Sequence, residues 1–414
     1  MDRFNEHFRM DEEAIKVYVA EKLKLFENIE DIKVSEIGDG NINYVFRAED
    51  IKSKKSVVIK QADKLLRSSG RPLDVDRNRI EAEVLKFYGE VASDYVPKIY
   101  HYDEVMCALT MEDISEYENL RHGLMKKKIY TNFAEDITTF MVNTLISTMD
   151  IVMNPWKKKE DVKKYINIEL CDITEKLVFT DPYTNHFGTN IVLDESSEFV
   201  KKEIYDDEEL VFEAGKLKYK FMNNPQSLLH GDLHSGSIFV TESKTKVIDP
   251  EFAFYGPIGY DLGNVVGNLF FSYIHSDIVM INEEQKRAYL NYLETTIVEI
   301  VDKFTEKFIR AYDEKVIDPM AKNPLYKRWM IASILEDASG MAGTEIIRRT
   351  IGDSKVKEIE SIESIEARVY MDKFLILLGK RLIKDRYIIN MGKDYINLID
   401  EVKKYLGKTG ECSI

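Results

Sequence analysis

Three carboxylates in two short segments are the residues of this chain best suited to chemistry. Asp232 lies within the polar stretch 230–237, and an apolar run then leads to Asp249-Pro250-Glu251. In phosphoryl transfer, one carboxylate orients and deprotonates an acceptor hydroxyl, while others hold the magnesium ion that bridges the nucleotide phosphates. Two carboxylates at strand spacing would face the same side. The pattern therefore predicts Asp232 as catalytic and Asp249 and Glu251 as metal ligands.

Each of these pieces also has a simpler interpretation. Asp232 could cap a turn, and Asp249 could merely end a strand. His230 and His234 flank Asp232 at short spacings, which are also found in zinc sites. Asp249 and Glu251 offer only oxygen atoms, and this ligand type favours magnesium.

A small-residue turn lies between two strand-like segments, 32–37 and 44–48. Glycines let backbone amides approach phosphate oxygens without a Cβ in the way. An asparagine stands where a third glycine would complete G-x-G-x-x-G, so a plain hairpin turn is the alternative to a nucleotide-covering loop. The residues expected to contact the nucleotide are Gly38, Gly40, Asn41 and Asn43.

Lys60 ends the β-branched strand-like segment that follows this turn. A lysine in that position can pair with the α- and β-phosphates of a nucleotide, although a lone strand-end lysine is usually solvated. It needs a carboxylate from the next helix, predicted over 77–89. Glu81 lies beside the apolar face and is favoured, but Glu83 remains possible from spacing alone.

Arg348 and Arg349 form a guanidinium pair on a late helical segment. Arginine forks bind phosphates and sugar hydroxyls, whereas a basic helical face is commonly only solvated.

Composition limits the classes of partner. The 414 residues are 44% hydrophobic and carry a net charge of −15, which argues against nucleic acid as the main partner. The cysteines show neither paired nor metal-type spacing, so a reducing compartment is expected. The first residues lack an apolar run, and the most apolar window, 265–274, is too short to span a bilayer. A cytoplasmic protein without membrane association is expected.

Hydrophobic periodicity predicts how these residues are positioned. Helical spacing covers 11–28 and 77–89, and strand-like segments cover 32–37, 44–48, 56–60, 97–102 and 104–111. From residue 112 onward the pattern is mainly helical. The fold class expected is α+β, with a small mostly-β N-lobe over 1–111 that binds nucleotide and a large, mainly helical catalytic and substrate lobe over 112–414. Trp156 is expected to be buried, and a flexible cover over the substrate is the alternative.

The same motifs, in this order, resemble the protein-kinase-like aminoglycoside and choline phosphotransferase superfamily. The resemblance is closer to one member family, the S-methyl-5-thioribose kinases of bacterial methionine salvage. It extends over nearly the whole chain. The most specific segments are 169–183 and 249–257, together with 38–47, 111–113, 230–237 and Arg348-Arg349.

The resemblance implies a bilobal kinase-like fold and transfer of the ATP γ-phosphoryl group to the 1-hydroxyl of methylthioribose, with Mg²⁺ as cofactor. It also implies adenine binding at the hinge residues Met111, Glu112 and Ile114, substrate binding at Asp232, Arg348 and Arg349, and a homodimer. Asp261 resembles the superfamily's structural aspartate. Ser237 replaces the usual asparagine, which leaves one or two metal ions open. The alternatives are a related kinase acting on an aminoglycoside, choline or homoserine, and a non-catalytic nucleotide-binding module.

Overall fold

A computed structural model describes residues 3–37, 43–65, 70 and 72–408. The chain separates into two compact units. The first comprises Met1–Tyr117 together with Lys246–Ala253, and the second comprises Glu118–Thr245 together with Phe254–Ile414. The assignment of nucleotide binding to residues 1–111 and catalysis to 112–414 concerns function and stays a prediction.

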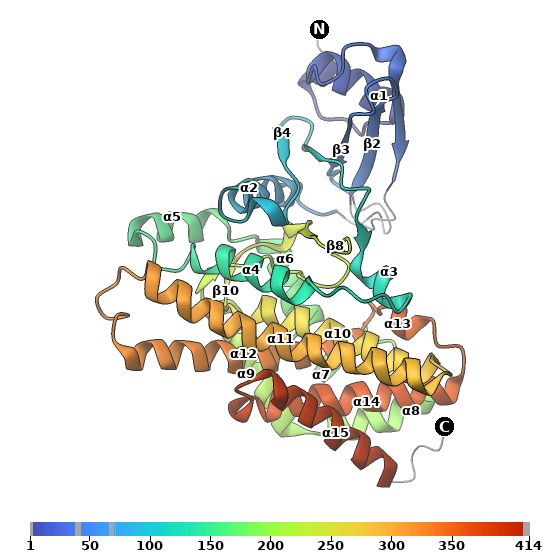
Figure 1. Cartoon of the computed structure of the whole chain (residues 1–414), viewed down its shortest axis with the longest axis vertical. Helices are drawn as coiled ribbons and strands as arrows, with labels where there is room; N and C mark the ends of the chain where they lie inside the picture. Colours follow the sequence, from blue (N-terminus) through green and yellow to red (C-terminus); the bar gives the residue numbers. More distant parts are fainter. Residues whose placement is uncertain (1–2, 38–42, 66–69, 71, 409–414) are drawn as a thin grey trace. The chain divides into compact units, whose positions relative to one another are not determined.

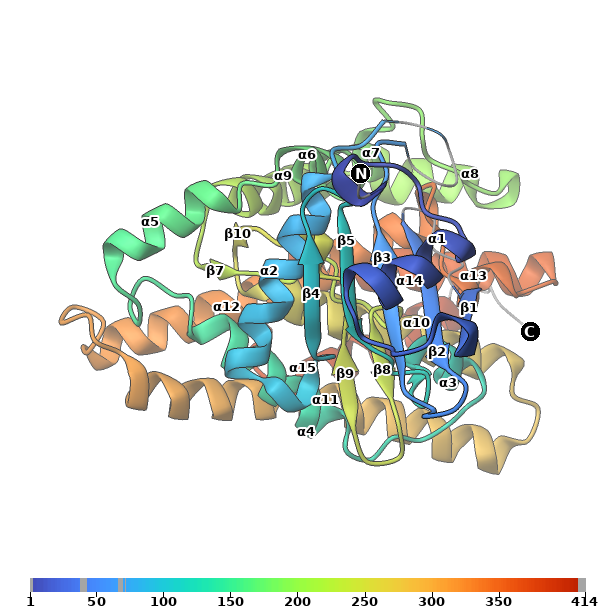
Figure 2. The same cartoon turned by 90° about the horizontal axis from the view of Figure 1, so that it is seen from above.

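The first unit is built on a five-stranded antiparallel sheet (Figure 2). Its spatial order is β1 (Ile32–Glu36), β2 (Tyr44–Asp50), β3 (Ser56–Gln61), β5 (Ala108–Glu112) and β4 (Ile99–Asp103). The central strand β3 is buried from Val57 to Gln61, because it has a neighbour on both edges and is covered by side chains. The β-branched run that predicted this strand therefore forms the middle of the sheet.

Helices complete the first unit. They are α1 (Glu12–Val17), which continues as the π-helical turn η2 (Tyr18–Lys22), α2 (Asp76–Val91), and the 3₁₀ turns η1 (Arg3–Asn5), η3 (Ile29–Asp31), η4 (Ser93–Tyr95) and η6 (Pro250–Phe252). Asp11 caps α1 by accepting the amide of Ala14. Ala14, Ile15 and Tyr18 are buried in a core shared with Phe46 and Ile59 of the sheet.

The strand predicted over 104–111 is wrong in its first residues. Residues 104–107 form a turn, because the Asp103 carboxylate accepts the amides of both Val105 and Met106 at 3.0 Å. Cys107 then adopts a left-handed φ of 46° before β5 begins. An aspartate that binds the amides two and three residues ahead is a common turn device.

The second unit is mainly helical. Its helices are α3 (Leu120–Met125), α4 (Phe133–Ile146), α5 (Pro155–Lys164), α6 (Ile168–Leu177), α7 (Asp181–Thr184), α8 (Asp194–Val200), η5 (Lys201–Tyr205), α9 (Glu208–Asn223), α10 (Gly259–Val279), α11 (Glu283–Lys315), α12 (Pro324–Ile351), α13 (Lys357–Glu360), α14 (Ile365–Lys384), η7 (Arg386–Ile388) and α15 (Gly392–Lys408). The short strands are β6 (Glu118–Asn119), β7 (Ser227–Leu228), β8 (Ile238–Val240) and β10 (Tyr255–Gly256), while β9 (Thr245–Val247) carries the chain back into the first unit. The predicted α+β class, with a small mostly-β part and a large helical part, is confirmed.

Helix α10 is the centre of the second unit and packs along α12, which in turn packs along α14 (Figure 1). Glycines permit the close approach of the first pair. A Cβ on Gly263 would lie 2.5 Å from the carbonyl oxygen of Ala338 and 2.7 Å from the amide nitrogen of Ala342. The backbones of α10, which bears Asp261, and α12, which bears the arginine pair, are therefore held at a fixed short separation.

The apolar window 265–274 lies within α10 and is buried throughout. Among the described residues, no helix combines the length and the hydropathy needed to span a membrane.

The expectation for Trp156 is wrong, because its side chain is 80% exposed. Helix α5 instead buries Lys158, whose ammonium group donates to the carbonyl groups of Thr148 and Gln226 and lies 4.1 Å from the ring centroid of Tyr255.

Candidate active site

Lys60 projects from the central strand β3 and is paired with helix α2. Its Nζ lies 2.9 Å from Oε1 and 2.8 Å from Oε2 of Glu81, and both side chains are buried. Glu83 binds Arg79 at 2.9 Å instead. Spacing alone left open whether Glu81 or Glu83 pairs with Lys60, and the structure shows that it is Glu81. Glu81 shares the buried face of α2 with Val84 and Leu85.

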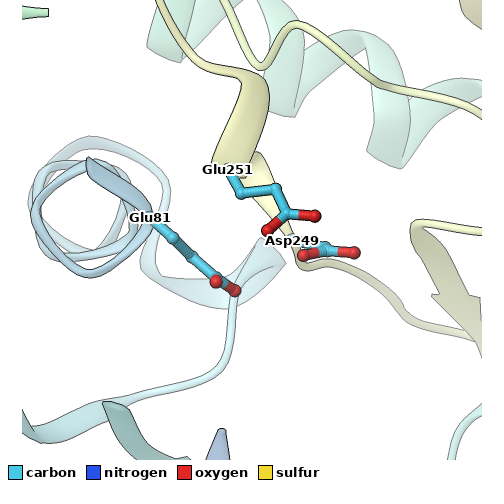
Figure 3. A group of neighbouring side chains, drawn as sticks. All are labelled: Glu81, Asp249 and Glu251. Carbon is cyan, nitrogen blue, oxygen red and sulfur yellow. The ribbon is translucent and has the colours of Figure 1, made fainter. Parts of the chain in front are cut away.

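Asp249 and Glu251 come together with Glu81 in the first unit. Ligand atoms of the three carboxylates lie within 4.8 Å of one another, and Figure 3 shows the three side chains converging from α2 and from the segment that follows β9. Lys60 also forms a hydrogen-bonded ion pair with Asp249. The side chain of Asp249 is 40% exposed, whereas that of Glu251 is buried.

The convergence of Asp249 and Glu251 does not come from strand periodicity, so that part of the prediction is wrong. Strand β9 ends at Val247, Asp249 adopts a left-handed conformation with φ 70° and ψ 43°, and Glu251 lies in the 3₁₀ turn η6. A non-glycine residue in this conformation is uncommon, and aspartate is among those that tolerate it best. The turn at Asp249 brings the two carboxylates together.

Two further side chains hold Glu251. Asn43 donates its amide to Oε2 of Glu251 at 3.0 Å and accepts a hydrogen bond from Arg77 at 3.0 Å, while Nε of Arg77 lies 3.7 Å from the same carboxylate. Sequence reasoning missed Arg77, which lies four residues before Glu81 on the same helical face. Asn43 was expected at the nucleotide, and the structure places it against a carboxylate. The other turn residues, Gly38, Gly40 and Asn41, lie outside the described residues.

This cluster carries an excess of negative charge. Burial, together with the charges of Asp249 and Glu251, raises the pKa of Glu81 to about 8. Burial and the charge of Asp249 raise the pKa of Glu251 to about 7. Burial works to lower the pKa of Lys60, but the neighbouring carboxylates hold it above its usual value. Because a divalent cation would offset the surplus charge and the available donors are carboxylate oxygens, the donor set fits a hard metal ion such as Mg²⁺.

Of the predicted hinge residues, Met111 and Glu112 end strand β5, and Ile114 lies two residues beyond it. Met111 pairs with Val58 of β3, the amide of Glu112 donates to the carbonyl of Lys98 at 2.8 Å, and the carbonyl of Ile114 accepts the amide of Tyr117 at 2.8 Å. Their adenine-binding role stays a prediction.

In the second unit, Asp232 lies in a loop fastened by Asp261 of α10. The Asp261 carboxylate accepts the amides of His230 at 2.7 Å and Gly231 at 3.0 Å. Gly231 has a φ of 82°, which is unstrained only in glycine. Ser237 donates its hydroxyl to the carbonyl of Asp232 at 3.1 Å. The loop is thus held from both sides of Asp232.

His234 lies beside Asp232, and sequence reasoning considered it only as a metal ligand. Its Nδ1 accepts the amide of Gly236 at 2.9 Å, so the ring proton of a neutral imidazole is on Nε2, which lies 3.3 Å from Oδ2 of Asp232. Nδ1 of His230 likewise accepts the amide of Asp232 at 3.3 Å. Over the described part of the chain, the group of side chains able to hold a metal consists of the three carboxylates of the first unit and neither histidine.

Arg348 and Arg349 also lie at Asp232. Their side chains are largely buried, so the alternative of a solvated basic helical face is wrong. Nη2 of Arg348 and Nη2 of Arg349 lie 3.6 Å and 3.9 Å from Oδ1 of Asp232. Glu345, which sequence reasoning missed, binds both guanidinium groups and is 1% exposed. Its spacing of three and four residues before the arginines is a helical signal that could have identified it.

The charges around Asp232 keep it ionised. Burial works to raise the pKa of Asp232, but His234 and the two arginines hold it well below its ordinary value. An ionised aspartate can accept a hydrogen bond from a hydroxyl group and orient that group. The two guanidinium groups beside it can bind further oxygen atoms of the same molecule.

Replacing Asp261 by asparagine is expected to loosen this loop. Asparagine has one carbonyl oxygen for two amide donors, and its NH₂ group would face the second donor. We expect Asp261→Asn to lower the free energy of unfolding by about 1–3 kcal/mol, the cost of leaving a buried group unsatisfied, and to lower kcat. Urea unfolding and steady-state kinetics measure both effects. Unchanged stability and unchanged kcat would contradict the anchoring role.

Comparisons with known proteins show which family this chain resembles over its length. The sequence model of the phosphotransferase enzyme family matches residues 197–296, which include Asp232, Asp249 and Asp261. A methylthioribose kinase of Bacillus pumilus is 36% identical over 394 residues, which are 95% of this chain and 97% of that protein. A methylthioribose kinase of Geobacillus kaustophilus is 37% identical over 390 residues, 94% and 96% of the two chains.

Among solved structures, an ethanolamine kinase of Plasmodium vivax aligns over 93% of this chain and 96% of its own, with 14% identity and a TM-score of 0.48. The curated relatives carry the assignment, because their identity extends over almost the entire length of both proteins. The chain belongs to the methylthioribose kinase family.

Proposed function

We propose that this protein transfers the γ-phosphoryl group of ATP to the 1-hydroxyl of 5-methylthioribose, giving 5-methylthioribose 1-phosphate and ADP in methionine salvage. Membership of the family implies a kinase that uses ATP and a divalent metal ion on a small-molecule substrate. The identity of the metal as Mg²⁺, the acceptor and the roles of single residues are parts of the proposal.

The second unit supplies the acceptor side of the reaction. Asp232 accepts a hydrogen bond from the 1-hydroxyl and directs its oxygen at the γ-phosphorus. The low pKa of Asp232 makes it a weak base, which suffices because little proton transfer has occurred in a loose transition state. Arg348 and Arg349 bind the remaining hydroxyl groups of the sugar. As the new P–O bond forms and the bond to ADP breaks, the hydroxyl proton passes to Asp232.

The first unit supplies the donor side. Lys60, held by Glu81, would bind the nucleotide phosphates, while Asp249 and Glu251 would hold the metal ion. When bound, the metal neutralises the phosphate charge that develops during transfer. Lys60 pairs with Asp249 as well as with Glu81. Binding of a metal ion by Asp249 and of phosphate by Lys60 would require the first of these pairs to open, and Glu81 would still hold the lysine.

The arginine pair beside an ionised aspartate is the observation that carries the choice of acceptor. Nη2 atoms of two guanidinium groups lie within 3.9 Å of Oδ1 of Asp232. Guanidinium groups donate hydrogen bonds and accept none, so the cationic groups of choline and aminoglycosides would find no partner on them. A neutral sugar with several hydroxyl groups has the acceptor atoms that arginine forks bind. The predicted homodimer, the cytoplasmic location and the number of metal ions stay predictions.

A coupled assay of ADP release tests the proposal across methylthioribose, ribose, choline, homoserine and an aminoglycoside. We expect methylthioribose to give the highest kcat/KM. Turnover of another acceptor without turnover of methylthioribose would show that the substrate is wrong. ATP binding without phosphoryl transfer to any acceptor would favour a non-catalytic nucleotide-binding module.

A further inference from the structure

Glu345 on helix α12 is buried and pairs with both arginines. Its Oε2 accepts Nε of Arg348 at 2.5 Å, and its Oε1 accepts Nε of Arg349 at 3.0 Å. Each guanidinium is therefore bound to Glu345 through Nε, while its Nη2 faces Asp232. The carboxylate of Glu345 thus fixes the orientation of both guanidinium groups.

Asn268 on helix α10 connects this carboxylate to the catalytic loop. Its Nδ2 donates to Oε1 of Glu345 at 3.2 Å, and its Oδ1 accepts the hydroxyl of Ser235 at 3.2 Å. Arg121 of α3 donates to the same Oδ1 at 3.2 Å and to the hydroxyl of Ser235 at 3.1 Å. Ser235 lies three residues after Asp232, so a buried chain of hydrogen bonds joins the catalytic loop to the arginine pair.

The charges of Asp232 and the two arginines explain why Glu345 is needed to hold the arginines in place. Asp232, like Glu345, lies within ion-pair distance of both Arg348 and Arg349. Without the charge of Glu345, both guanidinium groups would gain by closing on Asp232. The Asp232 carboxylate would then be engaged by the arginines and could not accept a hydrogen bond from the substrate hydroxyl. The two guanidinium groups would also no longer point at the sugar.

We propose that Glu345 is a positioning residue that holds Arg348 and Arg349 apart from Asp232 in the orientation that binds the acceptor, and that Asn268 sets this orientation relative to the catalytic loop. The inference rests on the proposed role of Asp232 and the arginines. It concerns the acceptor alone, since each residue in the chain of contacts belongs to the second unit.

A purely structural role is the alternative, and the chain offers a matched control. Asp372 on α14 is likewise buried, binds Arg368 at 3.0 Å with helical spacing, and accepts the hydroxyl of Ser196 at 3.2 Å. Asp372→Asn and Glu345→Gln both remove the charge from a buried carboxylate–arginine pair in the same unit. Of these two carboxylates, only Glu345 is paired with arginines that lie at Asp232.

The test compares the steady-state kinetics of Glu345→Gln and Asp372→Asn, using the acceptor that the wild-type protein phosphorylates. For Glu345→Gln we expect kcat/KM for the acceptor to fall by about 10²-fold, as for other displacements of a substrate-positioning group, with KM for ATP at the wild-type value. For Asp372→Asn we expect both constants to stay at wild-type values. Similar losses in the two variants, or an unchanged kcat/KM for Glu345→Gln, would overturn the inference.

Asn268→Ala provides a second route if Glu345→Gln does not fold. It keeps the carboxylate and both arginines and removes the link to Ser235, so we expect a selective rise in KM for the acceptor. An unchanged KM would overturn the inference. When both variants fold, we expect the effects of Glu345→Gln and Asn268→Ala on kcat/KM to be non-additive, because they act on the same arginine pair. Failure of methylthioribose as acceptor would refute the proposed function alone, since this test uses whichever acceptor is turned over.

Discussion

Asp232→Asn is expected to lower kcat by about 10²- to 10⁴-fold, the range for loss of a positioned general base. The asparagine amide keeps the shape of the side chain but not its negative charge. That charge strengthens the hydrogen bond from the substrate hydroxyl and pairs with the two arginines. The affinity for ATP should stay at the wild-type value, because the residues proposed to bind nucleotide and metal belong to the first unit. Steady-state kinetics and calorimetric titration with ATP measure the two quantities.

Asp313→Asn is the control for this substitution. Asp313 is exposed on α11 and pairs with Lys327 at 2.7 Å, so the same chemical change should leave kcat unaltered. Retention of wild-type kcat in Asp232→Asn would exclude a catalytic role for Asp232. A large loss of ATP affinity in that variant would contradict the proposed division of roles.

Asp249→Asn is the second substitution with a large expected effect. We expect kcat/KM to fall by about 10²- to 10³-fold, as when one electrostatic stabiliser of a transition state is lost. The Mg²⁺ concentration that gives half-maximal rate should rise, which it should not do in Asp232→Asn. Measuring the rate against Mg²⁺ concentration in both variants separates the metal-binding role from the catalytic one.

The same variant should fold at least as well as the wild-type protein. It removes one of three crowded carboxylates, and asparagine accommodates the φ of 70° at this position. We expect the free energy of unfolding to be unchanged or raised, as for other functional residues kept at a cost in stability. Asp94→Asn, an exposed position in the same unit, is the control. A clear loss of stability in Asp249→Asn without a change in Mg²⁺ dependence would contradict the assignment.

Local patterns in the sequence predicted much of the first unit. The pairing of Lys60 with Glu81 follows from a strand and the buried face of the next helix, and helical periodicity favoured Glu81 over Glu83. The turn at 104–107 was missed because it depends on a single side chain, Asp103, within an otherwise apolar run. Periodicity averages over several residues and does not detect such a turn.

Other features depend on the tertiary fold. Asn43 and Glu251 are 208 residues apart in sequence, and only the assembled first unit brings them into contact. The left-handed conformation of Asp249 is a property of one residue, and no pattern of hydrophobic residues indicates it. Glu345 differs from these, because its spacing to Arg348 and Arg349 is local; recognising it requires asking which acid holds a buried arginine pair.

Phosphorus NMR of the reaction product tests the central claim most directly. Wild-type protein with methylthioribose, ATP and Mg²⁺ should give ADP and a sugar monophosphate whose phosphorus couples to the proton on carbon 1, and Asp232→Asn should give neither at a comparable rate. A phosphate on another carbon, or release of inorganic phosphate without a phosphorylated sugar, would contradict the account.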